Sequence, residues 1–239
     1  MVKKIGLVIA VILVLLVVFG LTKNLIAKKV LSAMVKAQTG LELQIKSMRL
    51  GLLESFAYIN DLKVLNPPGY VDRVMMDIPE MYVSYDLTAF IKRKLRLGEL
   101  RLHLKELVVV KNEMGQLNIS LLEVVQDRKR EKVAQEEVKQ KTRIPKFQID
   151  LLQLKIDKVV YKDYSGGVPP KVREFNVNID EHYENITDPY SLGKLVMVRA
   201  LRKTTIASLT NFDLSPLIEG VANILKRTAT ITEKTFRKL

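Results

Sequence analysis

LRLGELRLHLKELVVVKN, residues 95–112, and FQIDLLQLKIDKVVYKDY, residues 147–164, align without a gap at an offset of 52 residues. Apolar and polar residues alternate in both copies, as in a strand with one apolar face. A repeated strand unit cannot bury such a face alone, so we expect the copies to stack with their neighbours in one sheet. The matching apolar positions are Leu95, Leu97, Leu100, Leu102, Leu104, Leu107 and Val108 in the first copy, and Phe147, Ile149, Leu152, Leu154, Ile156, Val159 and Val160 in the second.

The apolar phase shifts in both copies, at Gly98–Leu100 and at Asp150–Leu152. Such a shift indicates either two short strands or one strand with a bulge that redirects its face.

Further strands and helices are expected on both sides of the repeat. Alternation predicts strands over 41–46, 56–65, 80–85 and 175–179, and Asn66-Pro-Pro-Gly-Tyr70 predicts a firm turn. Apolar residues at helical spacing predict a short helix over 87–93 and two C-terminal helices, over 191–203 and 214–225. Between the copies, residues 127–143 are almost wholly polar and fit either a solvated helix or a flexible linker.

The N-terminal stretch 5–21 contains seventeen residues without a charge, between Lys4 and Lys23. As a helix it would be about 26 Å long, enough to cross a hydrocarbon core of roughly 30 Å with lysines at both ends. A cleaved signal peptide and a buried helix are the alternatives, but the apolar run is long and no small-x-small site follows it. The residues expected to form the membrane anchor are Ile5, Leu7, Ile9, Val11, Leu13, Leu15, Val17, Phe19 and Leu21.

Residues 23–40 read as an amphipathic helix. Its apolar stripe is formed by Leu25, Ile26, Val30, Leu31, Met34 and Val35. The helix either packs on the domain's own sheet or lies at a bilayer surface. In the second case the lysines that largely avoid the stripe contact headgroups: Lys23, Lys28, Lys29 and Lys36.

The expected fold class is α+β: an N-terminal transmembrane helix followed by a curved, mainly antiparallel β-sheet that forms a groove, with a few packing helices. The expected organisation is an anchor (1–22), an amphipathic helix (23–40), a first β half (41–126), a charged linker (127–143), a second β repeat (144–183) and C-terminal helices with a basic tail (184–239).

The charge and the composition of the chain narrow the classes of partner that we expect. The net charge is +13, which favours an anionic partner. No RNA-binding aromatic motif, zinc finger or Arg-rich arm is present, so we expect membrane phospholipid and no nucleic acid. The chain has no Cys, which excludes disulfides and thiolate metal sites.

The sequence contains few residues in arrangements typical of catalytic sites, so we expect neither enzyme activity nor a bound cofactor or metal. His103 lies on the polar phase of its strand, and His182 lies among acidic residues without the spacing of a calcium loop. The motifs HExxH, GxSxG and CxxC are absent.

The apolar surface of the expected sheet gives the remaining indication of function. The expected sheet has more apolar surface than the expected helices can cover, and uncovered apolar sheet must meet a partner protein or lipid tails. The candidate lipid-facing residues are Leu100, Leu102, Leu104, Leu152, Leu154 and Ile156.

Residues 1–122 resemble the N-terminal region of AsmA-like envelope proteins, which are related to the TamB and bridge-like lipid-transport group. The most specific matching pieces are the Asn66-Pro-Pro-Gly-Tyr70 turn, the helix start at Asp86-Leu87 and Gly115-Gln-Leu-Asn118. The resemblance implies a single-pass protein of the bacterial inner membrane with its body in the periplasm. It also implies a role in phospholipid traffic or envelope maintenance.

Two functions follow as expectations. The first is binding or transfer of phospholipid. The alternative is a non-catalytic structural or assembly factor that docks on another envelope protein. A homo-oligomer is a further expected partner, because the chain is short for a protein that bridges two membranes.

Overall fold

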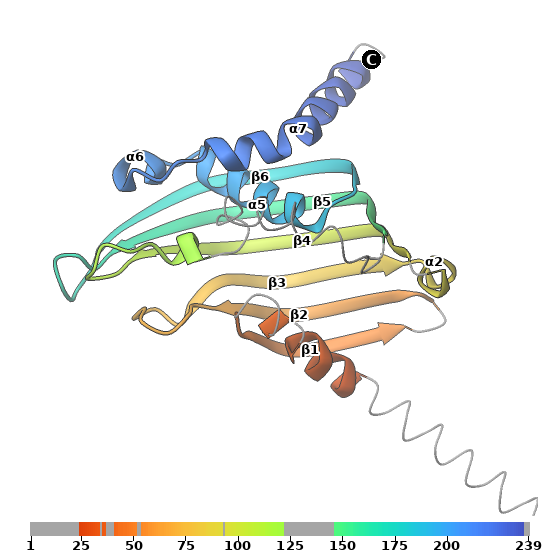
Figure 1. Cartoon of the computed structure of the whole chain (residues 1–239), viewed down its shortest axis with the longest axis horizontal. Coiled ribbons are helices and arrows are strands. Elements are labelled where there is room, and N and C mark those ends of the chain that lie inside the picture. The colour runs from red at the N-terminus through yellow and green to blue at the C-terminus, as the bar shows by residue number, and fades with distance from the viewer. Residues whose placement is uncertain are drawn as a thin grey trace, which may run out of the picture.

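The computed structural model describes residues 24–33, 35–36, 41–51, 54–92, 94–121 and 146–236. It contains one six-stranded sheet in the order β1-β2-β3-β4-β5-β6 (Figure 1). The strands are β1 (Leu43–Gly51), β2 (Phe56–Leu65), β3 (Val74–Tyr85), β4 (Lys94–Lys111), β5 (Lys146–Asp163) and β6 (Lys171–Ile186). Besides a helix over 24–33 and 35–36, the described helical elements are α2 (Leu87–Ile91), the 3-10 turn η1 (Asn118–Leu121), α5 (Pro189–Arg202), α6 (Ile206–Thr210) and α7 (Ser215–Phe236).

The two sequence copies are β4 and β5, and they lie side by side. They pair in parallel, and every paired residue is offset by 52, from Lys94 with Lys146 to Lys111 with Asp163. Each aligned apolar residue of one copy therefore stacks on its counterpart in the other. The prediction that the copies stack in one sheet is confirmed.

Each copy is a single long strand, and β4 contains a bulge. Across the β3–β4 pair, Ser84 faces Glu99 and Tyr85 faces Leu97, so Gly98 is the extra residue in β4. Asp150 stands at the matching place in β5, opposite Asn185 of β6, whose φ is 55°. The β5–β6 register is regular there and shifts instead between Ile156 and Lys158. The bulge at Gly98 keeps Leu97 and Leu100 on one face of the sheet.

The expected fold class needs two corrections. The β1–β2, β2–β3, β3–β4 and β5–β6 pairs are antiparallel, as expected for a mainly antiparallel sheet, but the β4–β5 pair is parallel and makes the sheet mixed. Because β4 and β5 run in parallel, the phase shift at Gly98 lies beside the one at Asp150. A parallel pair needs a long connection, which here takes the chain from the end of β4 back to the end of the sheet where β4 began. In addition, no helix in the described part of the chain combines the length and apolar composition needed to cross a membrane. The stretch 5–21, to which the anchor was assigned, lies outside the described residues.

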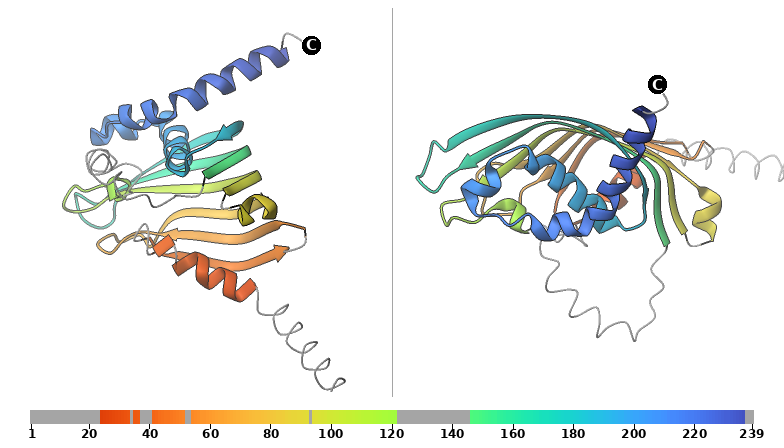
Figure 2. Two further views of the ribbon diagram at one scale, coloured as in Figure 1. Left: turned by 45° about the vertical axis from the view of Figure 1, so that its right-hand side comes forward. Right: turned by 90° about the horizontal axis from the view of Figure 1, so that it is seen from above.

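The helices gather on the concave side of the curved sheet, where α5 and α7 lie beneath β5 and β6 (Figure 2, right). A helix over 24–33 and 35–36 accompanies β1 at the opposite edge. There the backbone N–H of Leu50 donates to Asn24 Oδ1 at 2.9 Å, and Lys28 Nζ donates to the carbonyl of Lys46 at 3.5 Å. These two bonds satisfy backbone groups that a free sheet edge would expose.

Candidate functional site

The concave face is built from rows of side chains that cross all six strands. One row runs through Met48, Ile59, Met81, Leu102, Leu154 and Glu181, and the next runs through Leu50, Ala57, Val83, Leu100, Leu152 and Tyr183. Since residues alternate between faces along a strand, one apolar phase on each strand is enough to make this surface.

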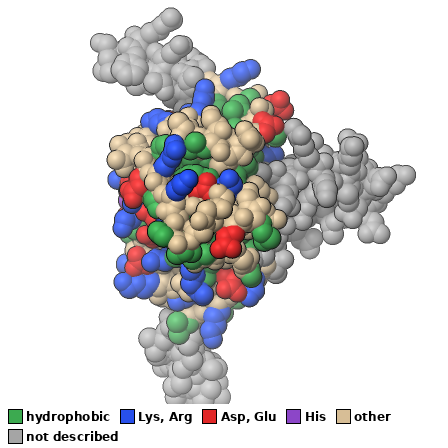
Figure 3. Space-filling view, turned by 90° about the vertical axis from the view of Figure 1, so that its left-hand side faces the viewer, with side chains coloured by type: hydrophobic (Ala, Val, Ile, Leu, Met, Phe, Trp, Pro, Cys, Tyr) green, Lys and Arg blue, Asp and Glu red, His purple; other side chains and the backbone are tan. Residues whose placement is uncertain are grey.

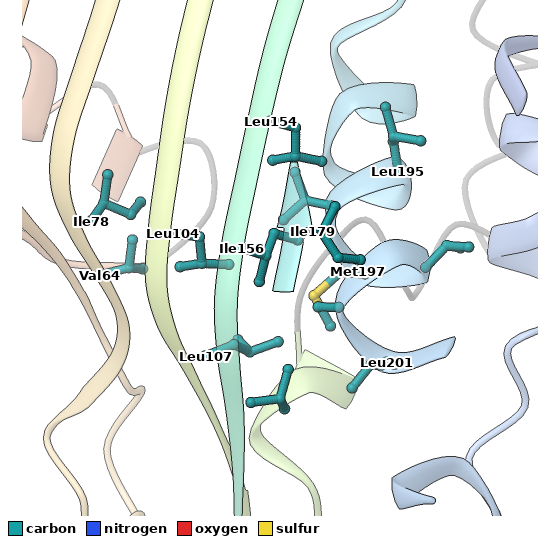
Figure 4. Packing of buried hydrophobic residues seen from close by; sticks show 14 of the residues in the cluster. Val64, Ile78, Leu104, Leu107, Leu154, Ile156, Ile179, Leu195, Met197 and Leu201 are labelled. Atoms are coloured by element: carbon teal, nitrogen blue, oxygen red, sulfur yellow. The ribbon is translucent and has the colours of Figure 1, made fainter. Parts of the chain in front are cut away.

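The two halves of the concave face differ in burial. Over β5 and β6 it is closed: Leu152 and Leu154 have no exposed surface, and Ile179 is 3% exposed. Side chains of α5, Leu195 and Met197 among them, pack against this part of the sheet (Figure 4).

Over β1 to β4 the face includes a band of half-buried apolar residues. It is named here the open band and consists of Met48, Met81, Val83, Leu97 and Leu102. Part of the concave face thus keeps apolar surface in contact with solvent.

The structure divides the six candidate lipid-facing residues. All six lie on the concave face, and Leu102 alone of them belongs to the open band. The other five lie in the core with exposures of 0–3%: Leu100, Leu104, Leu152, Leu154 and Ile156.

Sequence reasoning missed Met48, Met81, Val83 and Leu97 as members of a surface. The alternation of Met81 and Val83 within residues 78–85 indicated an apolar strand face. That this face lies beside Leu102 follows only from the strand order.

A polar group interrupts the closed half and ties α5 to β6. Glu181 on the sheet accepts from Arg199 Nε at 2.9 Å, and Tyr183 hydrogen-bonds to both side chains. Burial raises the pKa of the Tyr183 hydroxyl above its ordinary value, and the neighbouring Glu181 carboxylate adds to the rise. The phenol thus stays protonated and serves as a donor to Glu181.

The helix over 24–33 and 35–36 buries only part of the predicted apolar stripe, and Met34 lies outside the described residues. Leu31 packs against the main core. Leu25, Ile26 and Val30 are 60%, 53% and 50% exposed. The helix therefore contacts the domain and also keeps an apolar strip in solvent.

The lysines assigned to headgroups are placed as follows. Lys28 contacts the β1 backbone, Lys29 is exposed, and Lys36 forms an ion pair of 2.6 Å with Glu42. This contact lowers the pKa of the Glu42 carboxyl. Lys23 lies outside the described residues.

Two of the three sequence motifs behind the family resemblance meet at the end of the sheet where β2 and β4 finish. Asn118 Nδ2 donates to Asn66 Oδ1 at 2.8 Å and to the Val108 carbonyl at 2.8 Å. Its Oδ1 accepts from the backbone N–H groups of Val110 and Ile119, both at 2.9 Å. Asn118 has no exposed surface, so this network, named here the asparagine lock, joins the turn after β2 to η1.

The convex face is polar and ionic. His103 and Asp157 lie there, with Nε2 and Oδ2 separated by 2.8 Å, and Arg101 lies over the Tyr82 ring at 4.8 Å. The acidic neighbours of His182 separate, since Glu181 faces α5 while Asp180 and His182 lie on the convex side. Among the residues described, no group of three or more His, Cys, Asp or Glu side chains is placed to hold a metal ion.

Comparison with protein-family models, curated proteins and solved structures found no match. The assignment to AsmA-like proteins therefore stays a prediction from the quoted motifs.

Proposed function

We propose that this protein binds phospholipid on its concave face and holds it, or passes it on, at a membrane of the bacterial envelope. The observation that supports this function is the open band, Met48, Met81, Val83, Leu97 and Leu102, on a sheet whose other half is sealed by helices. In this proposal the protein has no catalytic role.

An acyl chain matches the chemistry of the open band. Its side chains are aliphatic or thioether groups, and each lipid CH₂ that leaves water contributes about 0.8 kcal/mol. Methionine side chains adapt to irregular partners, so Met48 and Met81 suit a ligand whose chain length and unsaturation vary.

The size of the sheet limits the role. Five strand spacings of about 4.8 Å give a width of about 24 Å. A surface of that width accommodates a lipid but does not bridge two membranes. We therefore propose that the protein holds lipid close to one membrane and hands it to a partner.

The periplasmic side of the inner membrane is the proposed location, as the resemblance implies. The exposed Leu25, Ile26 and Val30 beside Lys28 and Lys29 support contact with a membrane surface, because apolar residues enter the headgroup region while lysines meet anionic lipids.

The test is mass spectrometry of lipid bound to the full-length protein after gentle extraction. We expect phospholipid to copurify, and its amount to fall about tenfold in the double variant M81Q/L102Q. The matched control L209Q changes an apolar residue of α6 that is 39% exposed, and should keep the wild-type amount. A lipid-free wild-type protein would refute the proposal.

A specific observation favours docking on another envelope protein as a second function. Three loop tips at the asparagine-lock end carry exposed apolar residues: Val71, Met114 and Val168, exposed by 66%, 76% and 73%. Hydrogen bonds from Lys162 and Tyr164 to Asp72 join two of these loops, and Figure 3 looks onto this end of the molecule.

Crosslinking in cells through a photoreactive residue at position 114 tests this second function. A single crosslinked envelope protein would support it. Crosslinks only to lipid, or none, would count against it.

A further inference from the structure

Three loops meet at the end of the sheet where β4 and β5 finish. Lys111 and Asp163 are the last paired residues of these parallel strands, so the loops that follow them leave the sheet at the same end. The turn between β2 and β3 lies there as well, because Met76 near the start of β3 pairs with Leu107 near the end of β4. Each loop carries a strongly exposed apolar side chain, and these three residues are named here the loop tips: Val71, Met114 and Val168.

Tight turns hold two of the loop tips in place. The backbone N–H of Gly115 donates to the Asn112 carbonyl, and that of Gly167 donates to the Tyr164 carbonyl, both at 2.9 Å. Both glycines have a positive φ, 77° and 90°, which a residue with a Cβ rarely adopts. Each of these glycines is the sequence neighbour of a loop tip, so the backbone beside that tip has a fixed conformation.

The three loops are also joined to one another. Asp72 accepts hydrogen bonds from Lys162 Nζ and, at 2.8 Å, from the Tyr164 hydroxyl. The backbone N–H of Tyr164 donates to the Lys111 carbonyl at the end of β4, at 2.9 Å. The asparagine lock connects Asn66, at the start of the first loop, to η1. Because the loops are already ordered, binding through their tips costs little further conformational entropy.

The charges at this end favour an anionic surface. Two acidic residues are paired, Asp72 with Lys162 and, at 3.8 Å, Asp163 with Lys111. Among the described residues, Glu113 forms no ion pair, and neither do three exposed cations of the same loops and the start of β6: Arg73, Lys171 and Arg173. Apolar and charged side chains lie together on this end (Figure 3). The end therefore combines apolar tips with an excess of free cations.

We propose that the loop tips insert into the headgroup region of an anionic lipid bilayer. Exposed apolar surface marks contact with a protein or a membrane. Valine rarely carries the binding energy of a protein interface, and two of the three loop tips are valines. A bilayer needs no matching pocket for each tip, and it takes up apolar side chains while basic residues meet its headgroups. Insertion does not require lipid on the open band, and it competes with a docked protein for the same end.

The test uses single cysteines, because the chain has none of its own. V71C, M114C and V168C carry a fluorescent label at the loop tips, and H182C carries it on an exposed residue opposite Gln153 in the middle of β5. Each full-length protein is reconstituted in phosphatidylcholine vesicles, with or without phosphatidylglycerol, that contain a lipid with a spin-label quencher near its headgroup. Circular dichroism shows that each variant is folded.

We expect the quencher to reduce the fluorescence at all three loop tips in vesicles with phosphatidylglycerol, and to leave the label at position 182 unchanged. R73Q/K171Q/R173Q, made in the M114C protein, removes the three free cations, and the loss of each should weaken the contact about fivefold. The control K92Q/K94Q/K105Q removes the same charge from exposed lysines that form no ion pair within the described ranges. It should keep the quenching of the M114C protein.

The remaining outcomes overturn the proposal. Labels at the loop tips that stay as bright as the label at position 182 would show that the tips do not enter the bilayer. Equal quenching at all four positions would show that the contact is not specific to this end. Quenching at position 114 that persists in R73Q/K171Q/R173Q, or that is as strong without phosphatidylglycerol, would show that the surface is not recognised by its negative charge. None of these results depends on whether the open band holds lipid.

Discussion

Replacing Asn118 by Ala should strongly destabilise this fold. The side chain makes four hydrogen bonds: to Asn66 Oδ1, to the Val108 carbonyl, and from the N–H groups of Val110 and Ile119. Asn118 has no exposed surface, and Val110 has none either, so water has little access to the groups left behind. Each unpaired buried group costs about 1–3 kcal/mol, and we therefore expect N118A to lose about 4–6 kcal/mol.

The assay is urea unfolding followed by circular dichroism, with the slope compared between variants. N66A removes one of the four bonds and should lose about 1–2 kcal/mol, and the double variant should reveal a coupling of about 1 kcal/mol. Asn176 is exposed, so N176A should change stability by about 0.5 kcal/mol or less. A loss below about 1 kcal/mol in N118A would refute the view that the lock is a buried, fully satisfied network.

Three further predictions concern Tyr164, the last residue of β1 and the two halves of the concave face. Burial first, and then the bond to Asp72, raise the pKa of Tyr164 to about 12. The pKa of an unfolded tyrosine is about 10, so the stability that protonated Tyr164 contributes to the fold is complete below pH 10 and is lost as the pH rises to 12. The loss of stability with rising pH should therefore be less steep in Y164F than in the wild type. An identical steepness in the two proteins would contradict this. A Cβ on Gly51 would lie 2.3 Å from the Phe56 ring, so G51A should lower the thermal midpoint, and an unchanged midpoint would show that the ring moves freely. L154A should lower the free energy of unfolding in urea by about 2–5 kcal/mol, and L102A by less than half as much. The reason is that Leu154 is buried while Leu102, its neighbour on β4, is half-buried. Equal losses in the two variants would show that the open band belongs to the closed core.

The sequence predicted most elements of the sheet well, because alternation is a local property. The matched positions of the repeat, such as Leu104 with Ile156, turned out to be paired residues of β4 and β5. Strand direction was not predictable in the same way. The phase shifts at Gly98 and Asp150 fit either direction until the strands are known to be neighbours.

Burial was the least predictable property. Leu25, Ile26 and Leu31 share one stripe on the helical wheel, yet Leu31 alone of the three packs on the core. A helix that follows the edge of a sheet can bury only the side that touches it. The asparagine lock was also beyond sequence reasoning, since the partners Asn66 and Asn118 are 52 residues apart and come from two separate turns.

The parallel seam between β4 and β5 has a consequence for how the chain acquires its structure. The antiparallel strands β1 to β4, and the hairpin of β5 and β6, join residues that are near in sequence. The seam must close a loop of 52 residues before its first contact forms. Contacts of such separation form slowly, so we expect the two antiparallel parts to form first and dock afterwards.

During synthesis β4, with Val108, Val109 and Val110, emerges before its partner strand. Until β5 is made, this edge is an apolar template for pairing between nascent chains. Pulsed hydrogen exchange during refolding should show late protection of the amides that bridge β4 and β5. Protection there as early as in the β5–β6 hairpin would show that the seam nucleates folding.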